Sequence, residues 1–204
     1  MTIEGIEGAG KTTMARRIGD WFNHLHRPSL CAREPGSTPT GEAIRSLLLS
    51  PGIALSPESE MLLFEAARLQ LMDDLLLPAL EQYYAVILDR FIDSTLAYQG
   101  YGRGVDLNWI AALNQFASRG RKPDVTLLLD VDPKIGLDRA RTFSQANGQV
   151  DRFEAETIEF MQRVREGFLQ IAGNEPSRFV TIAVKDTIEE TWGDILKILE
   201  KRFL

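Results

Sequence analysis

Hydrophobic residues in this chain follow two patterns, short continuous runs and longer segments with an apolar residue at every third or fourth position. The runs at residues 85–89 and 125–130 are apolar almost up to a terminal aspartate, which is typical of strands buried on both faces of a parallel sheet. The segment that begins at Lys11 is periodic instead, which predicts an amphipathic helix. The two patterns take turns along the chain, so we expect alternating strands and helices.

The remaining elements follow from the same two patterns. Further strands are expected at residues 1–4, 29–33 and 179–184. Helices are expected at 42–49, at 56–81 with a break or bend near Pro78, at 106–118, from 133, at 154–172 and at 188–203. Such alternation is typical of an α/β domain whose parallel sheet is covered by helices on both faces. Ligands are expected at the carboxyl ends of the strands, which are marked here by Glu4, Arg33, Asp89 and Asp130.

Composition limits the class of protein. The 204 residues carry a net charge of −6, which argues against a nucleic-acid polymer as partner. No apolar run approaches the ~20 residues of a membrane-spanning helix, and no signal-peptide pattern opens the chain. The lone Cys31 cannot form an internal disulfide, which suits a reducing compartment. We therefore expect one domain over residues 1–204, in the cytoplasm and with no membrane partner.

A glycine-rich segment between the first strand and the first helix has the full pattern of a phosphate-binding loop. Glycines there let backbone N–H groups turn toward phosphate oxygens, and the helix N-terminus adds positive potential. Lys11 would reach the β- and γ-phosphates of ATP, and the Thr12 hydroxyl would bind Mg²⁺. The expected ATP-binding residues are Gly5, Ile6, Glu7, Gly8, Ala9, Gly10, Lys11, Thr12 and Thr13.

A carboxylate that helps to hold magnesium is expected at the end of an apolar strand. Asp89 and Asp130 both occupy such a position. Asp89 is followed at once by Arg90, which pairs a metal-ordering carboxylate with a cation that can bind phosphate. We therefore predict Thr12 and Asp89 as the magnesium ligands.

Other polar positions indicate a second nucleotide site. Phe64 and Arg68 lie four residues apart on a predicted helix, so a ring and a guanidinium share one face and could bind a nucleobase. No Asn-Lys-x-Asp run for reading guanine is present in the sequence. These features favour a kinase that acts on a small molecule over a GTPase.

Taken together, the motifs resemble those of bacterial thymidylate kinase, and the likeness covers nearly the whole chain. They are Glu7-Gly8-Ala9-Gly10-Lys11-Thr12-Thr13, Arg33-Glu34-Pro35-Gly36, Leu63-Phe64-x-x-x-Arg68, Asp89-Arg90-Phe91, Ala97-Tyr98-Gln99-Gly100, Arg119-Gly120-x-x-Pro123-Asp124 and Asp151-Arg152-Phe153-Glu154. The resemblance implies ATP- and Mg²⁺-dependent phosphorylation of dTMP to dTDP. It also implies a P-loop NTPase fold with a doubly wound, five-stranded parallel sheet, a mobile lid and a homodimer.

The resemblance also implies roles for individual residues. Phe64 should stack on thymine, with Arg68, Thr95 and Gln99 at its polar edge. Tyr98 should crowd the position of a ribose 2′-hydroxyl, and Glu7 should approach the sugar 3′-hydroxyl. Arg45 and Arg90 should bind the dTMP phosphate. The acceptor site should further include Glu34, Pro35 and Ser94.

The source of the catalytic arginine is a further expectation from the resemblance. Some thymidylate kinases carry it in the phosphate loop directly after the acid, where this chain has Gly8. A lid at about residues 139–152 should then supply it. Residues 142–149 carry no charge and are expected to form a flexible loop. Arg141 and Arg152 are the preferred catalytic candidates, and Arg139 is expected beside the adenine of ATP.

Three alternatives stay open at the level of sequence. Another P-loop nucleoside-monophosphate kinase is possible, because the thymine methyl group is worth only about 1–3 kcal/mol against uracil. A nucleotide-binding switch or slow NTPase would share the phosphate loop. A degenerate kinase without activity is the third, suggested by the uncharged stretch in the lid.

Overall fold

The structure is a computed structural model that describes residues 1–147 and 151–204. Within those residues, one parallel sheet has the strand order β2-β3-β1-β4-β5. The strands are β1 (Thr2–Glu4), β2 (Ser29–Arg33), β3 (Ala85–Asp89), β4 (Thr126–Asp130) and β5 (Phe179–Ala183). The predicted α/β class with a five-stranded parallel sheet is confirmed.

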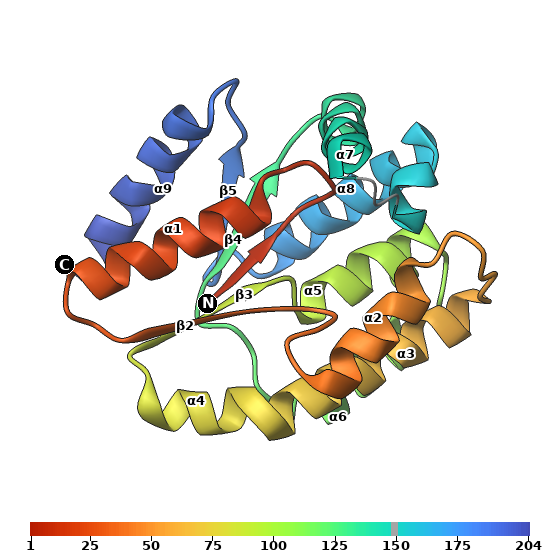
Figure 1. The fold of residues 1–204 in the computed structure, drawn as a ribbon, viewed down its shortest axis with the longest axis horizontal. Coiled ribbons are helices and arrows are strands. Elements are labelled where there is room, and N and C mark those ends of the chain that lie inside the picture. Colours follow the sequence, from red (N-terminus) through yellow and green to blue (C-terminus); the bar gives the residue numbers. More distant parts are fainter. Residues whose placement is uncertain (148–150) are drawn as a thin grey trace.

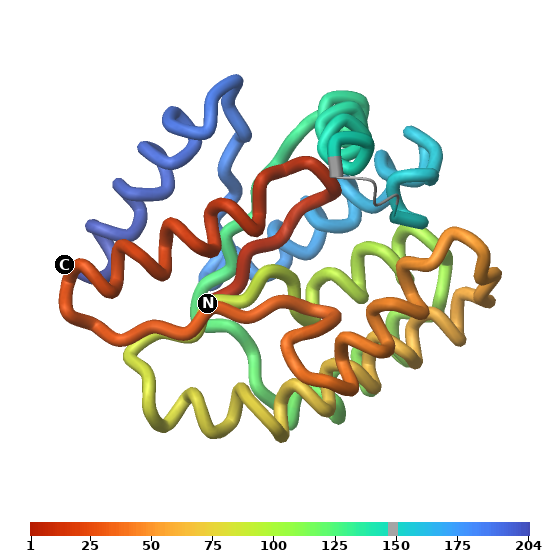
Figure 2. The backbone as a smooth tube through the Cα atoms, viewed as in Figure 1, coloured from red at the N-terminus to blue at the C-terminus, as the bar shows by residue number. Residues whose placement is uncertain are grey.

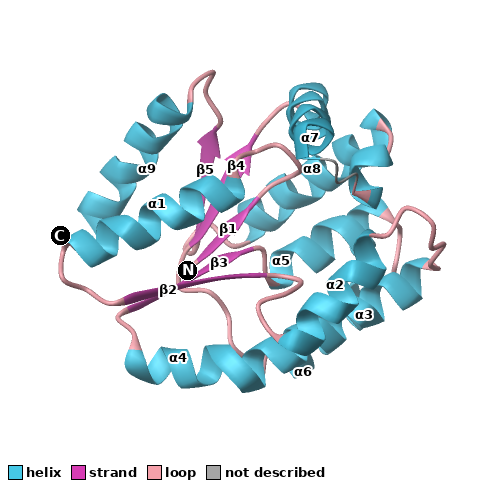
Figure 3. Ribbon diagram, viewed as in Figure 1, coloured by secondary structure: helices cyan, strands magenta, loops and turns pink. Residues whose placement is uncertain are grey.

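Helices cover both faces of the sheet (Figures 1 and 3). Helices α1 and α9 lie against one face, while α8 and the η1–α4 segment lie against the other. The α-helices are α1 (Lys11–His24), α2 (Pro39–Leu49), α3 (Pro57–Leu71), α4 (Leu77–Gln82), α5 (Ile92–Thr95), α6 (Leu107–Ala117), α7 (Pro133–Asn147), α8 (Ile158–Asn174) and α9 (Ile188–Phe203). The other helical turns are η1 (Met72–Leu76), η2 (Leu96–Gly102) and η3 (Arg152–Ala155).

The two faces of β3 show how the core is divided. Val86 and Leu88 pack in a cluster with η1 and α4, whereas Ile87 between them packs in the larger cluster that contains α1. Successive side chains of a strand point to opposite faces, so an apolar run with no polar residue is needed to fill both. No helix among the described residues is long and apolar enough to cross a membrane.

Parallel register brings the polar strand ends to one edge of the sheet. Arg33 of β2 is level with Asp89 of β3, and Ile3 of β1 is level with the same aspartate. Glu4 therefore lies at this edge too. The glycine loop and the turn after β3 leave the sheet here, as expected for ligand sites of open α/β sheets.

The predicted helix at 56–81 is interrupted earlier than expected. Helix α3 begins after the Ser56 cap as predicted, but the chain widens into the π-helical turn η1 before Pro78. Proline lacks an N–H group and its ring would clash with the carbonyl four residues before it. The distortion therefore falls on the turn that precedes the proline.

The starts of two other helices differ from the prediction because side chains cap them at other positions. Helix α2 begins at Pro39 instead of residue 42, because the Thr38 side chain accepts a hydrogen bond from the Gly41 N–H. The helix predicted at 154–172 divides into η3 and α8, and the Thr157 side chain caps α8 by accepting from the Phe160 N–H.

The segment α5–η2 was not predicted as a separate element. A Cβ at Gly102 would lie 2.8 Å from the Phe160 ring, so glycine permits the close approach of η2 to α8. This segment follows directly from the turn after Asp89 and carries Tyr98 and Gln99. The packing on α8 thus fixes the side of the site that faces the glycine loop.

Candidate active site

A cavity of about 460 Å³ opens at the carboxyl edge of the sheet. Its size is that of a site for a small organic molecule. Several residues of the predicted phosphate loop form one side: Glu7, Gly8, Gly10, Lys11, Thr12 and Thr13. The other side carries most of the predicted acceptor residues: Glu34, Pro35, Arg45, Phe64, Asp89, Arg90, Ser94, Thr95, Tyr98 and Gln99.

The glycine loop is held open by its backbone conformation. Gly8 and Gly10 have φ values of 70° and 90°, in the left-handed region that favours glycine. A Cβ at Gly8 would also lie 2.0 Å from the carbonyl oxygen of Gly136 in α7. The first turn of α1 contains no acidic residue, so the helix N-terminus keeps its positive potential for an anion.

Lys11 lies beneath this loop with its ammonium folded back. Its Nζ donates to the carbonyl oxygen of Ile6 at 2.7 Å, and the residue is 8% exposed. Burial lowers the pKa of Lys11 to about 8, and the nearby charge of Arg90 acts in the same direction. A bound polyphosphate would supply the negative charge that this buried cation lacks.

The predicted metal ligands meet in the structure. Thr12 Oγ1 donates a hydrogen bond to Asp89 Oδ2, and both residues line the cavity. Hard oxygen donors of this kind suit Mg²⁺. No cluster of three or more His, Cys, Asp or Glu in the described chain could hold a metal alone. Asp130 instead binds Arg165 through two hydrogen bonds, at 2.6 and 2.9 Å.

Glu7 of the phosphate loop forms a cluster with Arg90 and Tyr98 on the other side of the cavity. Arg90 Nη2 donates to Glu7 at 2.8 Å and to the Tyr98 hydroxyl at 3.0 Å, and the Tyr98 hydroxyl donates to Glu7 at 2.6 Å. Arg90 has a φ of 70° and also donates to the carbonyl oxygen of Gly5 at 3.0 Å. The cluster therefore joins the phosphate loop to the turn after β3.

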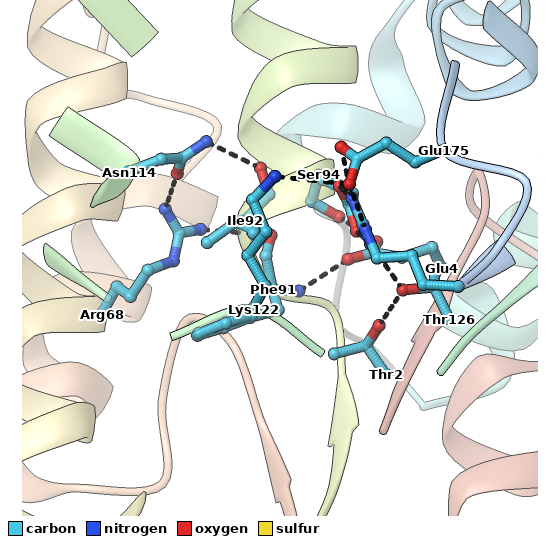
Figure 4. A network of polar contacts seen from close by, with 12 residues as sticks. Thr2, Glu4, Arg68, Phe91, Ile92, Ser94, Asn114, Lys122, Thr126 and Glu175 are labelled. Carbon is cyan, nitrogen blue, oxygen red and sulfur yellow. Dashed lines mark hydrogen bonds and ion pairs between the residues drawn. The ribbon is translucent and has the colours of Figure 1, made fainter. Parts of the chain in front are cut away.

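Glu4 binds the turn that carries Arg90, a role that the sequence did not reveal, and Figure 4 shows its contacts with Phe91 and Ser94. It accepts from the Phe91 N–H at 2.8 Å and from the Ser94 hydroxyl at 2.6 Å. The same Ser94 hydroxyl accepts from Arg90 at 3.1 Å. Burial raises the pKa of Glu4 to about 8, and the charge of Asp93 adds to the effect. Its place at the end of a strand was the available signal.

Arg68 differs from its predicted place at the edge of the base. It does not line the cavity and is 1% exposed. Its five N–H donors have protein partners, the Asn114 contact among them being visible in Figure 4. Those partners are the Glu34, Glu65, Asn114 and Thr95 side chains and the carbonyl oxygen of Phe91. Two carboxylates flank the guanidinium and offset the cost of burying its charge.

Comparison with known proteins settles the family. The thymidylate kinase family model matches residues 3–195. The chain belongs to the thymidylate kinase family. A thymidylate kinase from Carboxydothermus hydrogenoformans is 44% identical over 98% of this chain and 96% of its own length, and one from Desulfosudis oleivorans has the same identity and coverage. The crystal structure of thymidylate kinase from Ehrlichia chaffeensis superposes with a TM-score of 0.78 at 34% identity, covering 98% of this chain and 96% of that one.

The lid expected by analogy with other thymidylate kinases is only partly a loop. Residues 139–147 continue helix α7 instead of forming a flexible segment. Ser144 ties this helix to η3 by donating to Glu154 at 2.6 Å, whereas Thr142 donates within the helix, to the carbonyl oxygen of Asp138 at 2.8 Å. The part of the predicted lid at 148–150 lies outside the described residues.

The preferred lid arginines have other partners. Arg141 donates to the carbonyl oxygens of Glu154 and Glu156, at 2.9 and 3.3 Å. Arg152 donates to the carbonyl oxygen of Leu48 at 3.0 Å and to Glu60 at 2.7 Å. Neither lines the cavity, whereas Arg139, expected beside adenine, does. Spacing alone could not show this, because the competing acceptors lie on other elements.

Arg45 lies in the cavity wall, which also contains two acids, Asp151 and Glu34, whose pKa burial raises. It donates to the carbonyl oxygen of Pro35 at 3.0 Å. Burial raises the pKa of Asp151, which also lines the cavity, to about 6. Burial likewise raises the pKa of Glu34 to about 7 against the attraction of Arg68. Asp151 is a cavity residue that the sequence analysis placed in a motif but not in the site.

Proposed function

We propose that this cavity transfers the γ-phosphoryl group of ATP to dTMP, giving ADP and dTDP. One observation carries the proposal: residues of the phosphate loop, from Glu7 to Thr13, and a cluster suited to a nucleotide monophosphate line the same cavity. Membership of the thymidylate kinase family supports dTMP as the acceptor and ATP as the donor. The whole of 1–204 would then act as one domain, since the family match covers 3–195.

On the donor side, the loop and Lys11 would hold the phosphates of ATP. Backbone N–H groups of the loop supply partial positive charges, and the Lys11 ammonium adds a full positive charge. Thr12 and Asp89 would hold Mg²⁺, which neutralises charge on the phosphates when bound. Because few protein ligands are present, substrate oxygens and water would complete the coordination.

On the acceptor side, Arg90 and Arg45 would bind the dTMP phosphate, and Phe64 would stack on the base. Tyr98 and Glu7, joined by a 2.6 Å hydrogen bond, would lie against the sugar. The acceptor is already a phosphate oxyanion, so the transfer needs no general base. The work of the protein is to align the two phosphates and to spread the developing charge.

The remaining cation would come from the lid. Arg139 lines the cavity and lies in α7, so it is the lid arginine that we propose to reach the phosphates first. Arg141 and Arg152 would act only after leaving their present carbonyl and carboxylate partners. An arginine in this role can contribute on the order of 10³–10⁵ in rate.

The acceptor preference tests the proposal. ADP release is measured with dTMP, dUMP, dCMP, dGMP, dAMP and UMP, with Mg²⁺ and after addition of EDTA. We expect prompt turnover with dTMP, slower turnover with dUMP and loss of turnover in EDTA. ADP release that ignores the acceptor would instead indicate an NTPase, and release that survives EDTA would refute the magnesium site.

We also propose that the chain forms a homodimer through α3 and α6. These helices pack against each other (Figure 2). Each carries at least one exposed large apolar side chain. Leu62 is 53% exposed, Trp109 68% and Phe116 62%. Trp109 and Phe116 are seven residues apart, so they share one side of α6. Such a patch is typical of an interface.

The dimer proposal is tested by sedimentation equilibrium. We expect the wild type to sediment with twice the mass of one chain and Phe116→Glu to sediment as a monomer. Leu204→Glu, at an exposed apolar residue of the C-terminus, is the matched control and should leave the mass unchanged. A monomeric wild type would contradict the proposal.

A cytoplasmic location is proposed from the lone thiol, since a reducing compartment does not favour disulfides.

A further inference from the structure

The turn that carries Arg90 has a backbone conformation that needs support from its neighbours. Arg90 has a φ of 70°, in the left-handed region that a residue other than glycine rarely adopts. Such a conformation persists only where the surrounding structure holds it. The groups that hold this turn therefore also set where the Arg90 guanidinium lies in the cavity.

The left-handed residue changes the direction of the next N–H group. The Arg90 N–H donates to the carbonyl oxygen of Ile3 in β1 at 3.0 Å, as in a regular parallel ladder. In a regular strand the following N–H would point away from β1. Here the Phe91 N–H is turned back and donates to Glu4 Oε1 at 2.8 Å (Figure 4). Because a buried N–H without an acceptor is costly, the conformation of Arg90 depends on the carboxyl group of Glu4.

The second carboxyl oxygen of Glu4 acts on the Arg90 side chain. Glu4 Oε2 accepts from the Ser94 hydroxyl at 2.6 Å, and the oxygen of that hydroxyl accepts from Arg90 Nη1 at 3.1 Å. Arg90 and Ser94 line the cavity, whereas Glu4 does not line it and is fully buried. Glu4 thus holds the backbone of the turn directly and the guanidinium through one hydroxyl.

A separate ion pair fixes the helix that follows the turn. Asp93 in α5 accepts from Arg178 Nη1 and Nη2, at 2.8 and 2.7 Å. Arg178 Nη1 also donates to the Thr126 hydroxyl in β4 at 2.9 Å. These hydrogen bonds do not involve Glu4, so they should keep α5 on the sheet when the contacts of Glu4 are weakened. A change at Glu4 is therefore expected to loosen the Arg90 turn and to leave the fold in place.

We propose that Glu4 is a positioning residue for the acceptor phosphate: the reach of its carboxyl group holds the Arg90 turn and so directs the guanidinium at the phosphate of dTMP. The inference rests on the proposed function, in which Arg90 binds that phosphate. Glu4 lies outside the cavity, so its effect passes through Arg90 and Ser94. It should strengthen binding of the phosphate group and have little effect on binding of the nucleoside part.

Binding of dTMP and of thymidine separates these two parts. Thymidine is dTMP without its phosphate, so the ratio of the two dissociation constants, measured by isothermal titration calorimetry, reports the phosphate contact. Glu4→Asp keeps the charge, but its carboxylate is one methylene shorter and cannot reach both Phe91 and Ser94. We expect its preference for dTMP over thymidine to fall by about tenfold or more, the usual loss for a hydrogen bond to a charged group. Its affinity for thymidine should stay near the wild-type value.

Three further variants complete the test. Ser94→Ala removes the hydroxyl between Glu4 and Arg90 and should also lower the preference for dTMP. Glu4→Gln keeps the length and has an amide oxygen that can accept from the Phe91 N–H, so it should lose much less than Glu4→Asp. Asp130→Asn is the matched control, because Asp130 ends the neighbouring strand β4 and binds an arginine outside the cavity. Its ratio should equal that of the wild type. Thermal melting verifies that each variant is folded.

Several results would overturn the inference. One is a folded Glu4→Asp that keeps the wild-type preference for dTMP; if that variant does not fold, the same result with Ser94→Ala decides. An equal loss of thymidine affinity would indicate a general distortion of the site. A Glu4→Gln variant that loses as much as Glu4→Asp would contradict the role of reach. A wild type that binds thymidine as tightly as dTMP would refute the proposed function itself, so the two failures are distinguishable.

Discussion

Lys11→Ala should lower kcat by on the order of 10³-fold or more while the protein stays folded. The Lys11 ammonium is the buried cation of the phosphate loop, and a charge aimed at transferring phosphates contributes mainly in the transition state. Its lowered pKa shows that the fold alone does not stabilise the charged form. Removing it should therefore cost activity and not folding. Single-turnover rates and thermal melting measure the two effects.

Lys122→Ala is the matched control for this variant. Lys122 is largely exposed and pairs with Glu175 away from the cavity, so the rate should be unchanged.

The pH profile tests the role of Lys11 independently. Because burial lowers the pKa of Lys11 to about 8, kcat/KM for ATP should fall as pH rises through that value. A Lys11→Ala enzyme within tenfold of wild type would contradict the assigned role.

Arg68→Ala should destabilise the protein by about 3–5 kcal/mol. Arg68 is fully buried between two carboxylates, and its removal leaves Glu34 and Glu65 without their shared cation. One oxygen of each carboxylate already has no partner among the described residues. A loss of this size is a large share of the usual stability of a domain. Urea unfolding of wild type and variant measures it.

Arg119→Ala provides the comparison. Arg119 also forms an arginine–carboxylate pair, with Asp73, but both side chains are more than 40% exposed. Solvent screens such pairs, so its removal should change the urea midpoint far less. If Arg68→Ala unfolds at the wild-type urea concentration and only the KM for dTMP rises, Arg68 acts on the base directly and the structural role is wrong.

The phosphate loop could be predicted because its function is local. The glycines, Lys11 and Thr12 lie within one turn, and the strand before it and the helix after it fix the direction of its N–H groups. Asp89 was predictable for a similar reason, since an apolar run in a parallel sheet must end at the ligand edge. Gly8, Gly10, Lys11, Thr12 and Asp89 line the cavity in the structure.

The partners of buried charges could not be predicted in this way. Arg68 binds Glu34, 34 residues before it, and Asn114, 46 residues after it. Nothing in the spacing of Phe64 and Arg68 shows that one side chain enters the cavity and the other lies behind it. Arg68 lies behind the cavity because it is buried together with Glu34 and Glu65. That burial depends on how α3 packs against α6 and the loop after β2.

The flexible loop expected from residue 142 differs from the structure up to residue 147 for a related reason, while the lid itself stays a prediction. The uncharged, polar segment predicts a loop, but residues up to 147 continue helix α7, and Ser144 bonds to Glu154 of η3. Arg141 and Arg152 were ranked by charge and position, and both bind acceptors on neighbouring segments instead. These acceptors come from distant parts of the chain, so the sequence around each arginine does not show which acceptor it will bind.

The central claim is that one cavity aligns ATP with dTMP for direct transfer. It is tested by a quenched single-turnover reaction with γ-labelled ATP, Mg²⁺ and dTMP, in which the labelled products are separated. The account predicts that the label appears in dTDP in equal amount to the ADP formed, and that no ADP forms when dTMP is left out. Label appearing as inorganic phosphate, at a rate that does not depend on dTMP, would contradict it.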